Sequence, residues 1–134
     1  MIKVFVYGTL KPGGHYHQEY CGEGLVSAIP ALTRGQLFDF PHLGYPGMTP
    51  GTDWVQGYLL TFCSEAVLVG LDALEDYDPT RPRAENEYWR ERVVIFDLDY
   101  QKLELAWAYF MDTDRVRAMQ GIYLANGDWP VTKR

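Results

Sequence analysis

Cysteine and serine are scarce in this chain, and each shortage argues against a kind of site. The only cysteines are Cys21 and Cys63, which form no CxxC pair, so neither a disulfide scaffold nor a structural zinc site is indicated. The only serines are Ser27 and Ser64, and neither stands in a G-x-S-x-G elbow. We therefore predict no covalent serine catalysis. We interpret both cysteines as small buried hydrophobic side chains and expect a reducing, cytoplasmic location.

Positive charge and long apolar runs are also in short supply. The chain has 12 lysines and arginines against 18 aspartates and glutamates, a net charge of -6. A negative field of this kind repels polyphosphates and anionic membrane surfaces. No apolar run approaches the roughly 18 residues that indicate a membrane span, and the N-terminal run meets Gly8 too early for a signal peptide. We predict neither a nucleic-acid partner nor a membrane partner.

Candidate metal ligands are few and poorly spaced. His15 and His17 alternate around Tyr16, with Cys21 nearby. No third ligand follows at the spacing of a metal site. We predict that the protein needs no metal and no other cofactor, and that the two histidines have a surface or hydrogen-bonding role.

Aromatic residues, in contrast, are plentiful. They make up 15% of the chain, and such rings fill irregular barrels and cavities while their OH and NH groups suit a polar ligand site. We interpret Trp89, Trp107 and Trp129 as core or barrel filling. Hydrophobic residues at 47% and charged residues at 22% are typical of a globular protein. A length of 134 residues predicts a single domain over residues 1–134.

Local patterns predict an α+β fold of five or six strands with one principal helix. Ser64 suits the N-cap of a helix that runs to Asp76. Prolines and glycines cluster over residues 41–51, which predicts a long irregular crossing. Gly57 lies inside an apolar run and predicts a bulge or a close backbone approach. Strands are predicted over 2–7, 25–38 (two short strands around Pro30), 55–62, 88–98 and 103–109, with the last two forming a hairpin.

A glycine-rich turn follows the first strand, over residues 8–14. A phosphate loop would need Lys and Ser or Thr after its second glycine, whereas here Gly14 is followed by His15. We therefore reject nucleotide triphosphate binding. The backbone N–H groups of such a turn can still hold a small anion such as a carboxylate, although a plain turn is the alternative.

Glu75 is the most informative single residue. It shares one stripe of the predicted helix with apolar side chains, namely Val67, Leu68, Leu71 and Leu74. Loss of hydration on that stripe and the negative end of the helix dipole both favour the protonated carboxyl, so its pKa should be raised. Such a carboxyl suits a general acid and base. The alternative is a helix-end glutamate that bends into solvent or pairs with an arginine, for which Arg90 and Arg92 are the candidates.

Several short motifs together suggest a family. Tyr7-Gly8-Thr9-Leu10 after the first strand resembles the signature loop of the gamma-glutamylcyclotransferase-like family, in its small gamma-glutamylamine-type branch. The resemblance covers Met1 to about Phe110. The further motifs stand in the family's order: Gly35-Gln36-Leu37-Phe38, Tyr45-Pro46-Gly47, Val55-Gln56-Gly57-Tyr58-Leu59, Leu71-Asp72-Ala73-Leu74-Glu75, Tyr88-Trp89-Arg90 and Ala106-Trp107-Ala108-Tyr109.

The resemblance implies a fold, an activity and a set of site residues. It implies a small mixed β-barrel flanked by one main helix and short helices, with a ligand pocket at its mouth. Such proteins cyclise a gamma-glutamyl group to 5-oxoproline and release an amine or amino acid. By resemblance Glu75 matches the catalytic glutamate, and Tyr88 matches a tyrosine of the pocket wall. The substrate-gripping turn is matched by Tyr7, Gly8, Thr9 and Leu10.

The chain also departs from the family pattern. The segment from Asp76 to Glu87 is longer than in compact relatives, and we expect it to rim the leaving-group side of the pocket. The alternatives are a non-catalytic small-molecule binding module of the same fold and an enzyme that directs the same carboxylate at water. The sequence leaves open whether the substrate is a gamma-glutamyl amino acid, a gamma-glutamyl-ε-lysine crosslink or glutathione. It also leaves the oligomeric state open.

Overall fold

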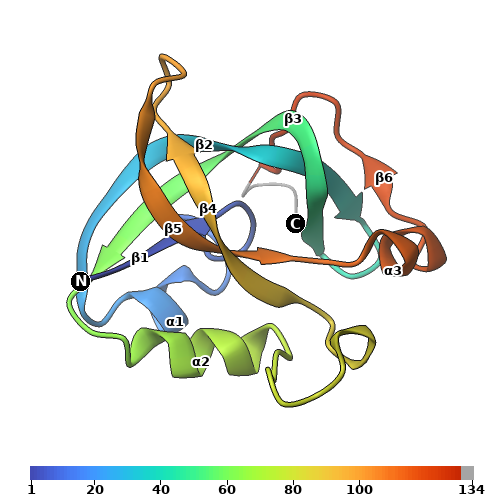
Figure 1. Ribbon diagram of the computed structural model, residues 1–134, viewed down its shortest axis with the longest axis horizontal. Coiled ribbons are helices and arrows are strands. Elements are labelled where there is room, and N and C mark those ends of the chain that lie inside the picture. Colours follow the sequence, from blue (N-terminus) through green and yellow to red (C-terminus); the bar gives the residue numbers. More distant parts are fainter. Residues whose placement is uncertain (131–134) are drawn as a thin grey trace.

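A ring of strands forms the body of the protein, and the computed structural model describes residues 1–130 (Figure 1). The strands are β1 (Ile2–Val6), β2 (Leu25–Phe40), β3 (Tyr45–Phe62), β4 (Trp89–Phe96), β5 (Lys102–Phe110) and β6 (Ile122–Tyr123). The helices are α1 (His17–Cys21), α2 (Val67–Leu74), α3 (Thr113–Ala118) and the short 3₁₀ helix η1 (Arg83–Glu85). The ring runs β3-β1-β5-β4-β2 and closes where β2 pairs with β3, while β6 adds to β2 outside it. The predicted small mixed β-barrel with few helices is confirmed.

Strand β1 crosses the middle of the molecule and is buried on both faces, as its apolar run predicts. It is antiparallel to β3 and parallel to β5. Since successive side chains of a strand point to opposite faces, β1 contributes to two apolar clusters. One cluster also contains residues of α1 and α2, whereas the other includes Trp89 and Trp129. Ile2, Val4 and Val6 belong to the first cluster, and Phe5 and Tyr7 belong to the second.

The prediction of an irregular crossing over residues 41–51 is wrong. Strands β2 and β3 form one long antiparallel hairpin, in which Phe40 pairs with Tyr45 and only residues 41–44 make the turn. The expected two short strands around Pro30 are likewise one continuous strand. The pairing jumps between Gly35 and Gln36, and this irregularity leaves residues 50–52 out of the register. A bulge of this kind absorbs proline and glycine residues without ending the strand.

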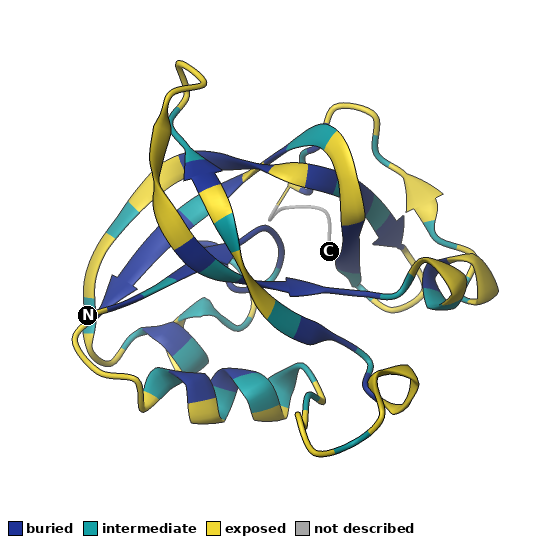
Figure 2. Ribbon diagram, viewed as in Figure 1, coloured by how far each residue is buried: buried dark blue, intermediate teal, exposed yellow. Residues whose placement is uncertain are grey.

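Helix α2 is shorter at both ends than the predicted range from Ser64 to Asp76. The Ser64 side chain accepts a hydrogen bond from the Ala66 N–H at 3.1 Å, one turn before the helix begins. The helix ends at Leu74, and Asp76 then takes a positive φ of 53°, a conformation that α-helices do not continue through. Helices α1 and α2 lie side by side beneath the ring (Figure 1), and the outer side of α2 is exposed (Figure 2).

Strands β4 and β5 pair as the predicted hairpin, whose tip extends beyond the ring and is exposed (Figure 2). On β5 the small side chains of Ala106 and Ala108 are buried, whereas Leu105 is 56% exposed. Cys21 is buried as predicted, but Cys63 is exposed, because it follows the last residue of β3. Among the described residues, no helix is both long and apolar enough to cross a membrane.

Candidate active site

A cavity of about 210 Å³ opens where β1 ends, beside the C-terminal end of α2 and the start of β3. All six site residues that the sequence singles out line it, so the fold brings together positions that lie far apart in the chain. The cavity is lined by Phe5, Val6, Tyr7, Gly8, Thr9, Leu10, Tyr16, Tyr45, Pro46, Leu74, Glu75, Glu87, Tyr88 and Tyr109.

The turn after β1 requires a glycine at its first position. A Cβ atom on Gly8 would lie 2.7 Å from ring carbons of Pro46, which is too close for any other residue. The Gly8 carbonyl accepts a hydrogen bond from the Lys11 N–H at 3.0 Å, and the Thr9 carbonyl accepts one from Tyr16 at 2.9 Å. The turn is therefore fixed through its carbonyl groups and packs directly against the pocket wall.

The N–H groups of the same turn have no partners among the described residues. Within residues 1–130, no hydrogen bond uses the N–H of Gly8, Thr9 or Leu10 as its donor. His17 has a hydrogen-bonding role, as predicted, because its Nδ1 lies 2.8 Å from the Leu10 carbonyl oxygen. A run of free N–H groups at a strand end is an anion-binding arrangement. The turn therefore presents donors at the edge of the cavity.

Glu75 directly follows α2, and its N–H donates to the Leu71 carbonyl at 2.9 Å. Burial raises the pKa of the Glu75 carboxyl to about 8, and the nearby carboxylate of Glu87 adds to the rise. The predicted increase is thus found. The cause is mainly desolvation, since removing a carboxylate from water favours its protonated form.

The alternative of a structural ion pair at Glu75 is wrong for the described part of the chain. Arg90 instead binds Asp72, with its Nε 2.9 Å and its Nη2 3.2 Å from the two carboxylate oxygens. The guanidinium of Arg92 lies over the ring of Trp107, 5.0 Å from its centroid. Among residues 1–130, no salt bridge neutralises Glu75, so its charge is opposed only by what a ligand brings.

Tyr7 and Tyr88 line the pocket, and their hydroxyl groups form hydrogen bonds with the backbone. The Tyr7 hydroxyl donates to the Tyr109 carbonyl at 2.8 Å and accepts from the Met48 N–H at 3.3 Å. The Tyr88 hydroxyl donates to the Pro46 carbonyl at 2.7 Å. Burial raises the pKa of both phenols well above the usual value, so both stay protonated. Their rings shape the cavity and their hydroxyls hold its frame.

Sequence reasoning missed a second carboxylate in the cavity. The Tyr45 hydroxyl donates to Glu87 Oε2 at 2.6 Å, which joins the start of β3 to the segment before β4. The Tyr109 hydroxyl similarly donates to Asp72 at 2.6 Å. The motif residues Tyr45 and Tyr109 were visible in the sequence, but no local pattern marks Glu87, because its place depends on the course of the preceding loop.

The cavity is electrostatically one-sided. Two carboxylates line it, and within the described residues no lysine, arginine or histidine does. No group of three or more His, Cys, Asp or Glu residues within residues 1–130 could hold a metal ion. The polar groups that face a ligand are therefore carboxylates, hydroxyls and backbone N–H groups.

The comparison with known families gives one match that spans nearly the whole chain. The family model for AIG2-like gamma-glutamyl cyclotransferases matches residues 4–131. The chain belongs to this family. The matched range contains the whole lining of the cavity. No curated protein matches the chain by sequence.

Solved structures with the same fold come from several organisms. An AIG2-like protein from Mus musculus superposes with a TM-score of 0.73 at 22% identity, covering 97% of this chain and 88% of the mouse protein. The ytfP protein from Escherichia coli gives a TM-score of 0.60 at 25% identity, with 99% and 100% coverage. YkqA from Bacillus subtilis gives 0.65 at 21% identity and covers 96% of this chain, which spans only 39% of YkqA.

Proposed function

We propose that this protein is a metal-independent gamma-glutamyl cyclotransferase, which releases 5-oxoproline and a free amine or amino acid from a gamma-glutamyl compound. The observation that carries the proposal is a glutamate with a pKa of about 8 in a small cavity, beside a turn with free N–H groups. Family membership supports the same activity. In this reaction the α-nitrogen bonds to the γ-carbonyl carbon, and the bond from that carbon to the leaving nitrogen breaks.

The raised pKa of Glu75 suits the first proton transfer. The substrate's α-amine is mostly protonated at neutral pH and cannot attack until it loses a proton. For a glutamate with a pKa near 4.3, taking a proton from an ammonium with a pKa near 8 costs about 5 kcal/mol. With a pKa of about 8 at Glu75, that cost nearly disappears. The arriving ammonium also favours the ionised form of Glu75 in the complex.

The turn suits the charge that forms next. Attack on the carbonyl carbon produces a tetrahedral oxyanion, which the N–H groups of Gly8, Thr9 and Leu10 can stabilise, or they can hold the substrate's α-carboxylate. Protonated Glu75 then gives its proton to the departing nitrogen. Closure of the five-membered ring is intramolecular, so positioning by the pocket walls supplies much of the rate.

The cavity has the size for a small ligand. A volume of about 210 Å³ is below the roughly 300–1,000 Å³ of pockets that enclose drug-sized molecules. A cavity of this size suits the glutamyl group alone, with the leaving amine directed toward the mouth. We therefore propose that the substrate is a small gamma-glutamyl compound.

A cytoplasmic location remains our prediction, and it rests on the low cysteine content.

The test is product analysis with a matched variant. Wild type and Glu75→Gln are incubated with gamma-glutamyl amino acids, amines and glutathione, and 5-oxoproline is measured by mass spectrometry. Lactam from the wild type, lost in Glu75→Gln but kept in the exposed control Glu85→Gln, would support the proposal. Open-chain glutamate would instead indicate hydrolysis. Ligand-induced shifts in Tm without any product would indicate a binding module.

A further inference from the structure

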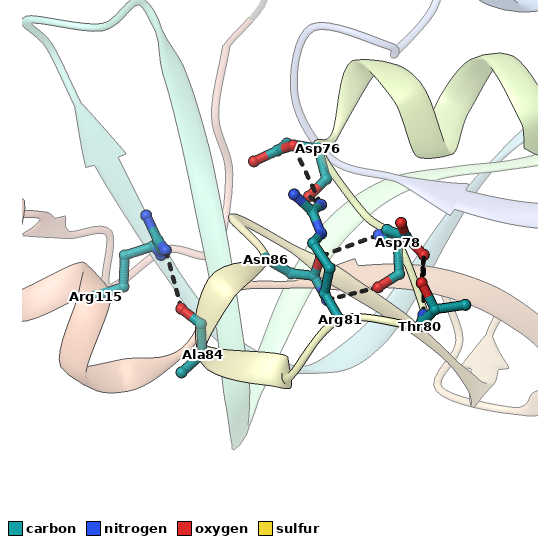
Figure 3. Close-up of polar contacts among 7 residues, drawn as sticks. All are labelled: Asp76, Asp78, Thr80, Arg81, Ala84, Asn86 and Arg115. Atoms are coloured by element: carbon teal, nitrogen blue, oxygen red, sulfur yellow. Dashed lines mark hydrogen bonds and ion pairs between the residues drawn. The ribbon is translucent and has the colours of Figure 1, made fainter.

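The loop between α2 and β4 is held by polar contacts among its own residues (Figure 3), and its last residue before Tyr88, Glu87, lines the cavity. Arg81 donates a hydrogen bond to the Asp76 carbonyl at 2.9 Å. The buried Asn86 forms two hydrogen bonds with Asp78: its Oδ1 accepts from the Asp78 N–H at 3.0 Å, and its Nδ2 donates to the Asp78 carbonyl at 3.2 Å. These contacts tie the two ends of the loop together. Further contacts join Thr80 to Asp78 and Arg115 to Ala84.

Glu87 comes directly after Asn86 and lines the cavity. Its Oε2 accepts the Tyr45 hydroxyl at 2.6 Å, whereas its Oε1 accepts no hydrogen bond from any residue within 1–130. Arg115 is a cation near Tyr45, but its guanidinium donates to the Ala84 carbonyl at 3.4 Å. No salt bridge to Glu87 is formed in the described chain. One oxygen of a half-buried carboxylate that lines the cavity therefore has no partner among the described residues.

Three polar parts of the cavity are each suited to a different part of a gamma-glutamyl substrate: the turn over residues 8–10, Glu75, and Glu87 with Tyr45. The turn over residues 8–10 offers N–H donors and suits the oxyanion or the α-carboxylate. Glu75 must meet the α-amine to accept its proton. The corner formed by Glu87 and Tyr45 is then left for the leaving group, and a negatively charged group there is repelled by Glu87.

Resting on the proposed cyclotransferase activity, we propose that Glu87 is a specificity-determining residue that selects substrates whose leaving amine carries a further positive charge. An ammonium on the leaving group can bind the free Oε1. An uncharged leaving group gains no such contact, and a carboxylate on it meets a like charge. Among residues 1–130 no basic side chain lines the cavity, so none of these residues compensates the negative charge of Glu87 there.

The experiment compares three gamma-glutamyl compounds that differ only at the far end of the leaving amine. The leaving groups are an n-alkylamine, a diaminoalkane and an ω-amino acid of matched chain length. Wild type, Glu87→Gln and the control Glu85→Gln are assayed for 5-oxoproline. Glutamine can still accept from Tyr45, so the loop is kept, and Glu85 is an exposed carboxylate of the same loop that undergoes the same change of charge.

We expect wild type to prefer the diamine compound over the alkylamine compound by roughly tenfold in kcat/KM, with the ω-amino acid compound lowest. Glu87→Gln should bring the diamine-to-alkylamine ratio close to one, while Glu85→Gln should keep the wild-type ratio. An equal loss with all three compounds in Glu87→Gln would overturn the proposal, since Glu87 would then act on the shared glutamyl part. An equal effect of Glu85→Gln would overturn it too.

Failure of the proposed reaction would be seen separately. If no compound gives lactam with wild type, the cyclotransferase activity is refuted, and binding of the same three compounds is measured by calorimetry. Tighter binding of the diamine compound that is lost in Glu87→Gln would still support charge selection by Glu87. Binding that ignores the charge of the leaving group would refute it.

Discussion

Replacing Glu75 with glutamine is expected to stabilise the fold at alkaline pH, by an amount that grows as the pH rises. The native carboxyl has a pKa of about 8 in the folded protein, against about 4.3 in an unfolded chain. Below about pH 4 both states are protonated and the charge costs nothing. Between these pKa values only the folded state holds the proton, so the stability of the wild type falls as pH rises. Glutamine does not titrate and avoids this loss.

The magnitude follows from the same two pKa values. A difference of roughly 3.7 pKa units corresponds to about 5 kcal/mol above pH 8, if the carboxylate is kept fully from water. Glu75 retains part of its exposure, and solvent reaching the charge reduces its cost. We therefore expect Glu75→Gln to exceed the wild type by about 2 kcal/mol in the free energy of unfolding near pH 8.5, and by little near pH 4.5.

The assay is urea denaturation followed by tryptophan fluorescence, at steps from pH 4.5 to pH 8.5. The slope m should be the same for both proteins, so that the difference in midpoint reports stability alone. Glu85→Gln is the control, because an exposed glutamate should give a difference that does not change with pH. A constant difference for Glu75→Gln, or one that shrinks as pH rises, would refute the desolvation of Glu75.

Three further predictions concern the site and its frame. The kcat/KM for lactam formation should rise with pH, with an apparent pKa of about 8. Glu87→Gln should move this rise to lower pH, because the carboxylate that helps to raise the pKa of Glu75 is removed. An unchanged pH profile would show that Glu87 does not act on Glu75. Gly57→Ala should lose about 3 kcal/mol in urea denaturation, because its Cβ would lie 2.2 Å from the Val6 carbonyl oxygen. Asp72→Asn should also move the rise in kcat/KM to lower pH, because Arg90 loses its partner and can pair with Glu75. Measurement of kcat/KM against pH would test this, and an unchanged profile would contradict it.

The parts of the site that the sequence predicts are those with local causes. An apolar stripe on one helix is enough to place Glu75 on the buried side, and its raised pKa follows from that burial. The turn over residues 8–10 is likewise marked by a strand that meets a glycine. The close approach expected at Gly57 is found, because a Cβ there would strike the Val6 backbone. Each inference needs only a few neighbouring residues.

The errors and omissions have causes that lie far away in the chain. Residues 41–51 contain the usual signals of a loop, yet the long pairing of β2 with β3 overrides them and places the excess residues in an irregularity. Cys63 is exposed because of where β3 ends. Glu87 reaches the cavity through a contact with Tyr45, 42 residues away in the sequence. No periodicity records such a contact.

The proposed role of Glu75 as a base depends on where the charge of Arg90 lies. Arg90 carries a positive charge close to α2, and pairing with Glu75 would lower the pKa of that carboxyl and remove its use near neutral pH. Asp72, on α2 and three residues before Glu75, binds the guanidinium with both carboxylate oxygens and also accepts a hydrogen bond from the Tyr109 hydroxyl. Asp72 thus neutralises the positive charge of Arg90 beside the pocket. A structural ion pair three residues away therefore leaves Glu75 without a cationic partner among the described residues, which the proposed proton transfer requires.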